Sequence, residues 1–186
     1  AISSYKRALK IKPDYAQAHN NMGNIQKEKG DLDAAISSYK RALKIKPDYA
    51  QAFNNMGNTL KEKGDLEAAI NSYKQALKIR PDYAQAYSNM GDALKEKGDL
   101  DAAISNYKKA LEIKPDYAEA YNNMGLTLND KGDLEAAIDC YKQALRIKPD
   151  YAEGYSDLGN ALLLLNQSEQ ALVSFEKAIS LKKDLN

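Results

Sequence analysis

One stretch of the chain decides its fold, because close copies of it follow one another. Residues 47–81 read PDYAQAFNNMGNTLKEKGDLEAAINSYKQALKIRP. Apolar and small residues recur at helical spacing from 52 to 60, and a second series of this kind runs from 66 to 77. Proline cannot continue the hydrogen bonds of a helix, so the prolines at both ends bound the pair. The stretch therefore predicts two helices joined by a short turn.

The ends and the crossing of these two helices have their own signals. Asp48 with Gln51 three residues later matches a capping box and predicts the start of the first helix. Gly64 tolerates a positive φ, and Asp65 after it predicts an acidic cap on the second helix. Gly57 is small, which predicts a close approach of the two helices there, because a larger side chain would push them apart.

The same pair of helices repeats along the chain. Prolines lie 34 residues apart at Pro13, Pro47, Pro81, Pro115 and Pro149. No strand-like alternation interrupts the pattern, so we predict an all-α solenoid of 34-residue helix-turn-helix units. The predicted units are 16–49, 50–83, 84–117, 118–151 and a divergent 152–185, with 1–15 as the second helix of a truncated unit.

The unit resembles the tetratricopeptide repeat, whose aromatic, Leu-Gly, Ala, aromatic, Ala and Pro positions it reproduces. In the third unit these are Tyr87, Met90-Gly91, Ala103, Tyr107, Ala110 and Pro115. This resemblance implies a right-handed superhelix in which the first helix of each unit lines a concave surface. Asn at the sixth position of the first helix is similar to the superhelical repeats of O-linked N-acetylglucosamine transferases and related bacterial proteins.

Composition excludes several classes of partner. Lys and Arg number 27 against 26 for Asp and Glu, a formal net charge of +1 that gives no overall attraction to nucleic acid or an anionic membrane. No apolar run approaches the ~18 residues of a membrane-spanning helix. A single cysteine cannot form an internal disulfide, so nothing indicates an oxidising compartment. We expect a soluble, cytoplasmic segment of a longer protein.

The residues give no sign of an enzyme, a metal site or a cofactor. His19 is the only histidine and stands where the other units have Phe or Tyr, so we interpret it as a packing residue. Cys140 has no second Cys or His nearby in the sequence, which argues against a reactive thiol. The glycines occur singly at repeat junctions, without a phosphate-binding cluster.

A binding surface is the stronger prediction. On each first helix, the residues off the apolar stripe fall at i, i+4, i+7 and i+11, which is one face. Amides dominate this face, and an Asn side chain both donates and accepts hydrogen bonds, so a row of them can hold the backbone of an extended peptide or a partner helix. A merely solvated polar face is the alternative. The candidate residues are Asn21, Asn24, Asn55, Asn58, Asn89, Asp92, Asn123, Asp157 and Asn160.

One known ligand of the resembled family does not fit. Its members that grip the C-terminal carboxylate of heat-shock chaperones use Lys and Asn, then Asn, then Lys and Arg in successive units. Asn24 and Asn55 are present here, but Asn20 replaces the first Lys, and Gln85 and Asn89 replace the basic pair. A carboxylate would lie there without a cation, so we reject a chaperone clamp.

The last unit departs from the pattern. Leu163, Leu164 and Leu165 stand where the second unit has Lys61, Glu62 and Lys63. Polar positions that turn apolar indicate a covered surface, either under a capping helix or following domain, or in docking or self-association through the end of the solenoid. Two further hypotheses therefore stand beside a peptide-binding scaffold: the substrate-recognition arm of a larger glycosyltransferase or sulfotransferase, and a homo-oligomerisation module.

Overall fold

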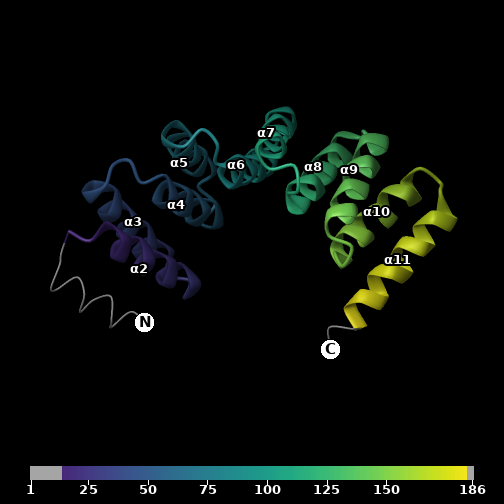
Figure 1. Cartoon of the computed structure of the whole chain (residues 1–186), viewed down its shortest axis with the longest axis horizontal. Helices are drawn as coiled ribbons and strands as arrows, with labels where there is room; N and C mark the ends of the chain where they lie inside the picture. The colour runs from purple at the N-terminus through teal and green to yellow at the C-terminus, as the bar shows by residue number, and fades with distance from the viewer. Residues whose placement is uncertain (1–13, 184–186) are drawn as a thin grey trace. The chain divides into compact units, whose positions relative to one another are not determined.

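Residues 14–183 of the chain are described by a computed structural model, and within them ten α-helices and no strand occur (Figure 1). The helix predicted for residues 1–15 lies almost wholly outside this range, as do residues 184–185 of the last predicted unit. The helices are α2 (Ala16–Glu28), α3 (Leu32–Ile45), α4 (Ala50–Glu62), α5 (Leu66–Ile79), α6 (Ala84–Lys97), α7 (Leu100–Ile113), α8 (Ala118–Lys131), α9 (Leu134–Ile147), α10 (Ala152–Leu164) and α11 (Ser168–Lys183).

The helix starts confirm one capping prediction and correct the other. Asp65 caps α5, since its Oδ1 accepts the Ala68 N–H at 3.1 Å, and Asp31, Asp99 and Asp133 cap α3, α7 and α9 in the same way. The capping box predicted at Asp48 is wrong. Tyr49 is the N-cap of α4 and makes no side-chain cap bond, because the helix begins one residue later than the box requires. Asp48 contributes its backbone carbonyl, which accepts from Ala50 N at 3.2 Å.

The turn between paired helices needs a left-handed residue. Gly64 has φ +88°, as predicted, and an added Cβ would meet no atom within 4 Å, so backbone conformation rather than space selects glycine. In the last unit Asn166 takes this conformation with φ 59°. Asparagine adopts the left-handed backbone conformation more readily than most other residues with a side chain, which explains why this turn needs no glycine.

A glycine–tyrosine contact holds the two helices of a hairpin together. A Cβ at Gly57 would lie 2.6 Å from Cε1 of Tyr73, a ring that is fully buried. The predicted close approach is therefore confirmed, and an aromatic ring fills the space left by the missing side chain. Gly23 meets Tyr39, Gly125 meets Tyr141 and Gly159 meets Phe175 in the same way.

The described helices fall into two compact units, residues 1–97 and 98–186. In the first, α2 packs on α3 and α4 on α5, while α3 contacts α4 and α5 contacts α6. The second has the pairs α8–α9 and α10–α11, with α7 against α8 and α9 against α10. First helices also touch directly, α2 with α4, α4 with α6, and α8 with α10. Each unit is thus a stack of helical hairpins, which makes the chain an all-α solenoid.

Candidate functional site

The predicted binding residues lie on one face of each first helix. We call this the polar face and number positions from the first residue of each first helix, so it comprises positions 2, 6, 9 and 13. On α4 these are Gln51 and Glu62, both exposed, with half-buried Asn55 and Asn58 between them. Half-buried candidates elsewhere are Asn21, Asn24, Asp92, Asn123 and Asp157, while Asn160 is exposed. Eight of the nine candidates are therefore at least partly exposed to solvent, the exception being Asn89.

Tyrosine hydroxyls orient the amides at position 9. Tyr39 Oη–H donates to Asn24 Oδ1 at 2.8 Å, and Tyr73 Oη–H donates to Asn58 Oδ1 at 2.7 Å. Burial raises the pKa of Tyr73 above its usual range, and Asp92 and Glu96 add to the shift, so the hydroxyl stays protonated and able to donate at neutral pH. With Oδ1 occupied, each amide keeps its Nδ2 group, which donates to no other residue between 14 and 183.

The amides at positions 5 and 6 bond to one another between neighbouring first helices. Asn55 Nδ2 donates to Oδ1 of Asn20 and of Asn24, both at 3.1 Å, and Asn89 Nδ2 donates to Asn54 Oδ1 at 2.9 Å. Asn20 and Asn54 are buried. Part of the amide row thus joins the repeats. Asn89 shows this most clearly, since its side chain is buried and its Oδ1 accepts from Gln85.

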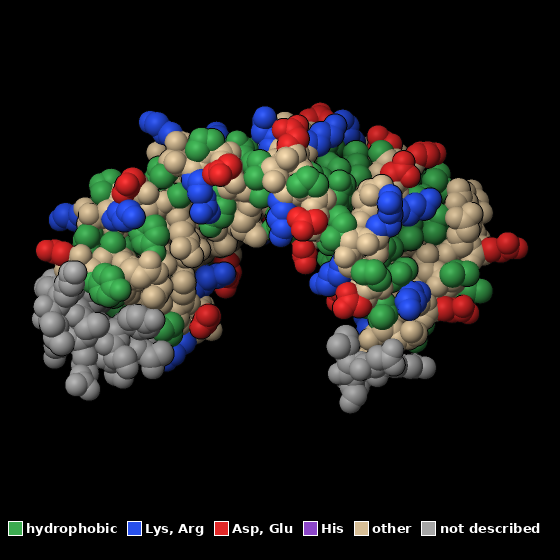
Figure 2. Space-filling model, viewed as in Figure 1, with side chains coloured by type: hydrophobic (Ala, Val, Ile, Leu, Met, Phe, Trp, Pro, Cys, Tyr) green, Lys and Arg blue, Asp and Glu red, His purple; other side chains and the backbone are tan. Residues whose placement is uncertain are grey.

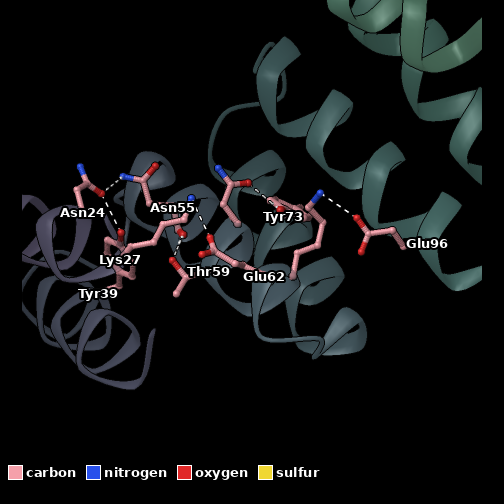
Figure 3. Close-up of polar contacts among 10 residues, drawn as sticks. Asn24, Lys27, Tyr39, Asn55, Thr59, Glu62, Tyr73 and Glu96 are labelled. Atoms are coloured by element: carbon pink, nitrogen blue, oxygen red, sulfur yellow. Dashed lines mark hydrogen bonds and ion pairs between the residues drawn. The ribbon is translucent and has the colours of Figure 1, made fainter. Parts of the chain in front are cut away.

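Lysines and glutamates form a second row beside the amides. Lys27 Nζ lies 3.4 Å from a carboxylate oxygen of Glu62, and Lys61 Nζ lies 3.1 Å from one of Glu96 (Figure 3). Position 12 of one repeat therefore faces position 13 of the next. The sequence reasoning missed these pairs, although each joins residues 35 apart and the residue types repeat at that spacing.

These groups line a small, open pocket in the first unit. Its volume is about 220 Å³, and it is lined by Asn24, Lys27, Glu28, Tyr39, Asn55 and Asn58. Three of the predicted residues therefore lie together with the Tyr39 hydroxyl and one ion-paired lysine. Figure 3 shows Asn24 and Asn55 turned toward each other across the helices that carry them. The pocket offers amide N–H donors to an uncharged acceptor such as a peptide carbonyl.

The second unit carries a different set of groups on its polar face. Asn122 Nδ2 donates to Asp157 Oδ2 at 2.9 Å, so the amide orientation is the reverse of that in Asn20 and Asn54. The carboxylate at 157 has no hydrogen to donate, and Asn122 Oδ1 is left buried without a partner. Leu126 replaces the position 9 amide.

The three leucines of the last unit divide into two groups. Leu163 and Leu164 are exposed, at 47% and 61% of their surface. Leu165 is half-buried and packs against the core of the last two hairpins, which includes Tyr141, Leu158 and Ala171. Leu165 is thus a core residue, and the exposed apolar surface belongs to Leu163 and Leu164.

The two residues considered for catalysis, Cys140 and His19, are both buried. Cys140 is buried, and burial raises the pKa of its thiol to about 11, with Asp139 adding to the shift, so it is protonated at neutral pH. His19 is buried on α2. Residues 14–183 contain no cluster of His, Cys, Asp and Glu suited to a metal ion.

The surface has no dominant charge. Figure 2 shows Lys and Arg side chains interspersed with Asp and Glu over each unit in the view drawn. Among the helices of the described range, none has the length and apolar character needed to cross a membrane.

Comparison with known families and structures gives consistent matches. The family model described as TPR repeat matches residues 1–30, 23–64 and 57–98, and the one described as Tetratricopeptide repeat matches 82–150 and 116–184. No curated protein matches the sequence.

Several solved structures share the fold. A crystal structure of MamA is 29% identical, with a TM-score of 0.79, and the match covers 88% of this chain and 95% of that one. YrrB, described as a TPR protein with an unusual peptide-binding site, is 22% identical with a TM-score of 0.74 and coverages of 99% and 95%. A structure of pilF from Pseudomonas aeruginosa is 18% identical with a TM-score of 0.82, covering 89% of this chain and 75% of that one.

Proposed function

We propose that this chain, which belongs to the tetratricopeptide repeat family, is a non-enzymatic scaffold that binds an extended peptide on the polar face of α2 and α4. Asn24 and Asn58 are the central residues. Their Nδ2 groups donate to carbonyls of the peptide backbone, and the pocket beside Tyr39 receives one residue of the ligand. A protein of the same fold, YrrB, has a peptide-binding site, which supports this class of ligand.

The observation that carries the proposal is the pair of tyrosine–amide bonds. An exposed Asn side chain rotates freely and loses that freedom on binding. Asn24 and Asn58 are already held by Tyr39 and Tyr73 at 2.8 and 2.7 Å. Because the amides are oriented before the ligand arrives, binding costs less entropy. Tyr39 and Tyr73 fill the space beside Gly23 and Gly57, and their hydroxyls fix the two amides in addition to this packing role.

Backbone recognition also explains which ligands fit. The two charged residues that line the pocket, Lys27 and Glu28, have opposite signs, so the pocket has no net formal charge to select an ionic partner. Backbone carbonyl groups occur in every peptide, and amide donors can hydrogen-bond to them whatever the side chains of the peptide are. The first unit is therefore suited to an extended segment of varied sequence.

The test replaces only the donors. Asn24→Asp with Asn58→Asp keeps an oxygen acceptor for each tyrosine hydroxyl and removes both NH₂ groups. An aspartate occurs naturally at position 9 of the next repeat, where it is Asp92. Each lost hydrogen bond is worth about 0.5–1.5 kcal/mol. We expect a peptide selected from a displayed library of random, unstructured 12-residue sequences to bind roughly 5- to 150-fold more weakly by calorimetry.

The matched control adds the same charge elsewhere. Ser37→Asp with Asn71→Asp places two carboxylates at exposed positions of α3 and α5, where α9 has Asp139. The control variant should bind like the unmodified chain. Equal binding by all three proteins would remove the polar face of α2 and α4 as the peptide site.

A further inference from the structure

The two compact units differ in charge on their polar faces. In the first unit, Lys27 and Lys61 at position 12 pair with the glutamates at position 13 of the next repeat. The second unit has Asn129 and Leu163 at position 12 instead. Its first helices α8 and α10 thus lack the lysines that offset the carboxylates of the first unit.

Carboxylates gather at the N-terminal part of α10. Position 2 is Glu119 in α8 and Glu153 in α10, where the first unit has glutamines, and position 6 of α10 is Asp157. Glu153 lines a pocket with Tyr151, and all three carboxylates raise the pKa of Tyr151 after the larger effect of its burial. Lys148 pairs with Glu119 at 3.6 Å. Between residues 14 and 182, no cation lies within ion-pair distance of Glu153 or Asp157, although Lys148 and Lys182 line a pocket together with Glu153.

Apolar side chains follow on the same face. Leu164 lies on the line of Glu153, Asp157 and Asn160 because these residues are spaced i, i+4, i+7 and i+11. It is 61% exposed, and its neighbour Leu163 is 47% exposed. An α-helix rises 1.5 Å per residue, so about 10 Å separates Asp157 from Leu164 along the axis, and about 16 Å separates Glu153 from it.

We propose that the polar face of α10 binds the part of an extended peptide in which a basic side chain and a large apolar side chain lie three to five residues apart. Charge complementarity places the cation at Glu153 and Asp157, and the apolar side chain covers Leu163 and Leu164. The spacing follows from the axial distances, since an extended chain advances about 3.3 Å per residue. This inference rests on the proposed function, because it assigns the ligand preference of the second unit to the same scaffold.

The direct test uses 12-residue unstructured peptides with one Arg and one Leu four residues apart, followed by fluorescence anisotropy. Comparison peptides carry Glu for the Arg, Ser for the Leu, or a ten-residue separation. We expect each change to weaken binding, and raising the salt concentration should weaken only the Arg-containing peptides. Equal binding of all the peptides would overturn the preference.

Two protein variants locate the contacts. Asp157→Asn places at position 6 of α10 the residue found in every other first helix, and we expect about 2- to 5-fold weaker binding, the size of a partly exposed charge pair. Leu163→Lys with Leu164→Glu restores the residues found at the same positions of α2, Lys27 and Glu28. We expect peptide binding to weaken on the order of tenfold or more, because the apolar side chain of the peptide loses its contact with both leucines.

Matched controls are available in the same unit. Asp139→Asn removes an exposed carboxylate from α9, and Val173→Lys changes a residue on α11 that is 65% exposed. Neither should change binding. Circular dichroism checks that each variant keeps its helices.

The outcomes separate this inference from the proposed function. If Asn24→Asp with Asn58→Asp weakens the peptide but the α10 variants do not, the scaffold stands and the preference of α10 is overturned. If the leucine variant instead converts a dimer to a monomer in sedimentation, a second copy of the chain covers the leucines and the proposal fails.

Discussion

Gly57→Ala should destabilise the chain, although alanine favours helices more than glycine does. The added Cβ would lie 2.6, 2.8 and 2.9 Å from three ring atoms of Tyr73. Ordinary contact begins near 3.4 Å, so the ring must move by about 0.8 Å. Tyr73 is fully buried and its hydroxyl bonds to Asn58 at 2.7 Å, which leaves the ring no free direction.

The magnitude follows from three effects. Alanine gains at most about 1 kcal/mol over glycine within a helix. Forcing an extra methyl into a filled core costs about 1–3 kcal/mol, and losing the tyrosine–amide bond costs about 1 kcal/mol more. The costs exceed the gain, so we expect the free energy of unfolding to fall by roughly 1–3 kcal/mol.

The chain provides a matched comparison for this variant. Gly159→Ala would bring a Cβ to 2.6 Å from Cε1 of Phe175, an equivalent contact with a half-buried ring that has no hydroxyl. We expect a smaller loss there, by about 1 kcal/mol, because no hydrogen bond breaks. Neighbouring repeats unfold together, so the assay is urea unfolding followed by both tyrosine fluorescence and circular dichroism. A midpoint for Gly57→Ala at or above that of the parent chain would refute the reasoning.

Three further predictions concern single groups. Asp157→Asn should raise the free energy of unfolding by about 1 kcal/mol, since Asn122 Oδ1 regains a donor; a lower urea midpoint would contradict this. Burial raises the pKa of Tyr73, so above pH about 10, where unfolded tyrosine loses its proton, the folded state holds more protons and stability falls. This fall should be shallower in Tyr73→Phe, and equal slopes in the two proteins would argue against it. Cys140 should react with a thiol reagent at pH 8 only as fast as the fold opens, because the thiol is buried with a pKa of about 11; immediate reaction in the absence of denaturant would contradict this.

Much of the fold could be predicted because its signals are local. Gly64 predicts the turn, and Asp65 directly after it predicts the helix cap; the structure confirms both. The box at Asp48 failed for a local reason as well, since a shift of the helix start by one residue moves a capping side chain out of reach. The pattern of residue types does not determine such a shift.

The candidate site was less predictable because its bonds join different repeats. Asn55 bonds to Asn20, Lys27 pairs with Glu62 and Asn122 bonds to Asp157, in each case 35 residues away. The sequence indicated that the amides share a face but not that neighbouring first helices meet with an offset of one residue beyond the period. Because of that offset, some amides of the row bond to one another across repeats, and Asn89 is buried.

The central claim is that peptide carbonyls bind the Nδ2 groups of Asn24 and Asn58. The most direct measurement is the side-chain amide region of a nitrogen–proton NMR spectrum during titration with a selected peptide. We predict saturable shifts for Asn24 and Asn58 and none for Asn71, which is exposed on α5. Peptide binding that leaves the Asn24 and Asn58 signals in place would contradict the account.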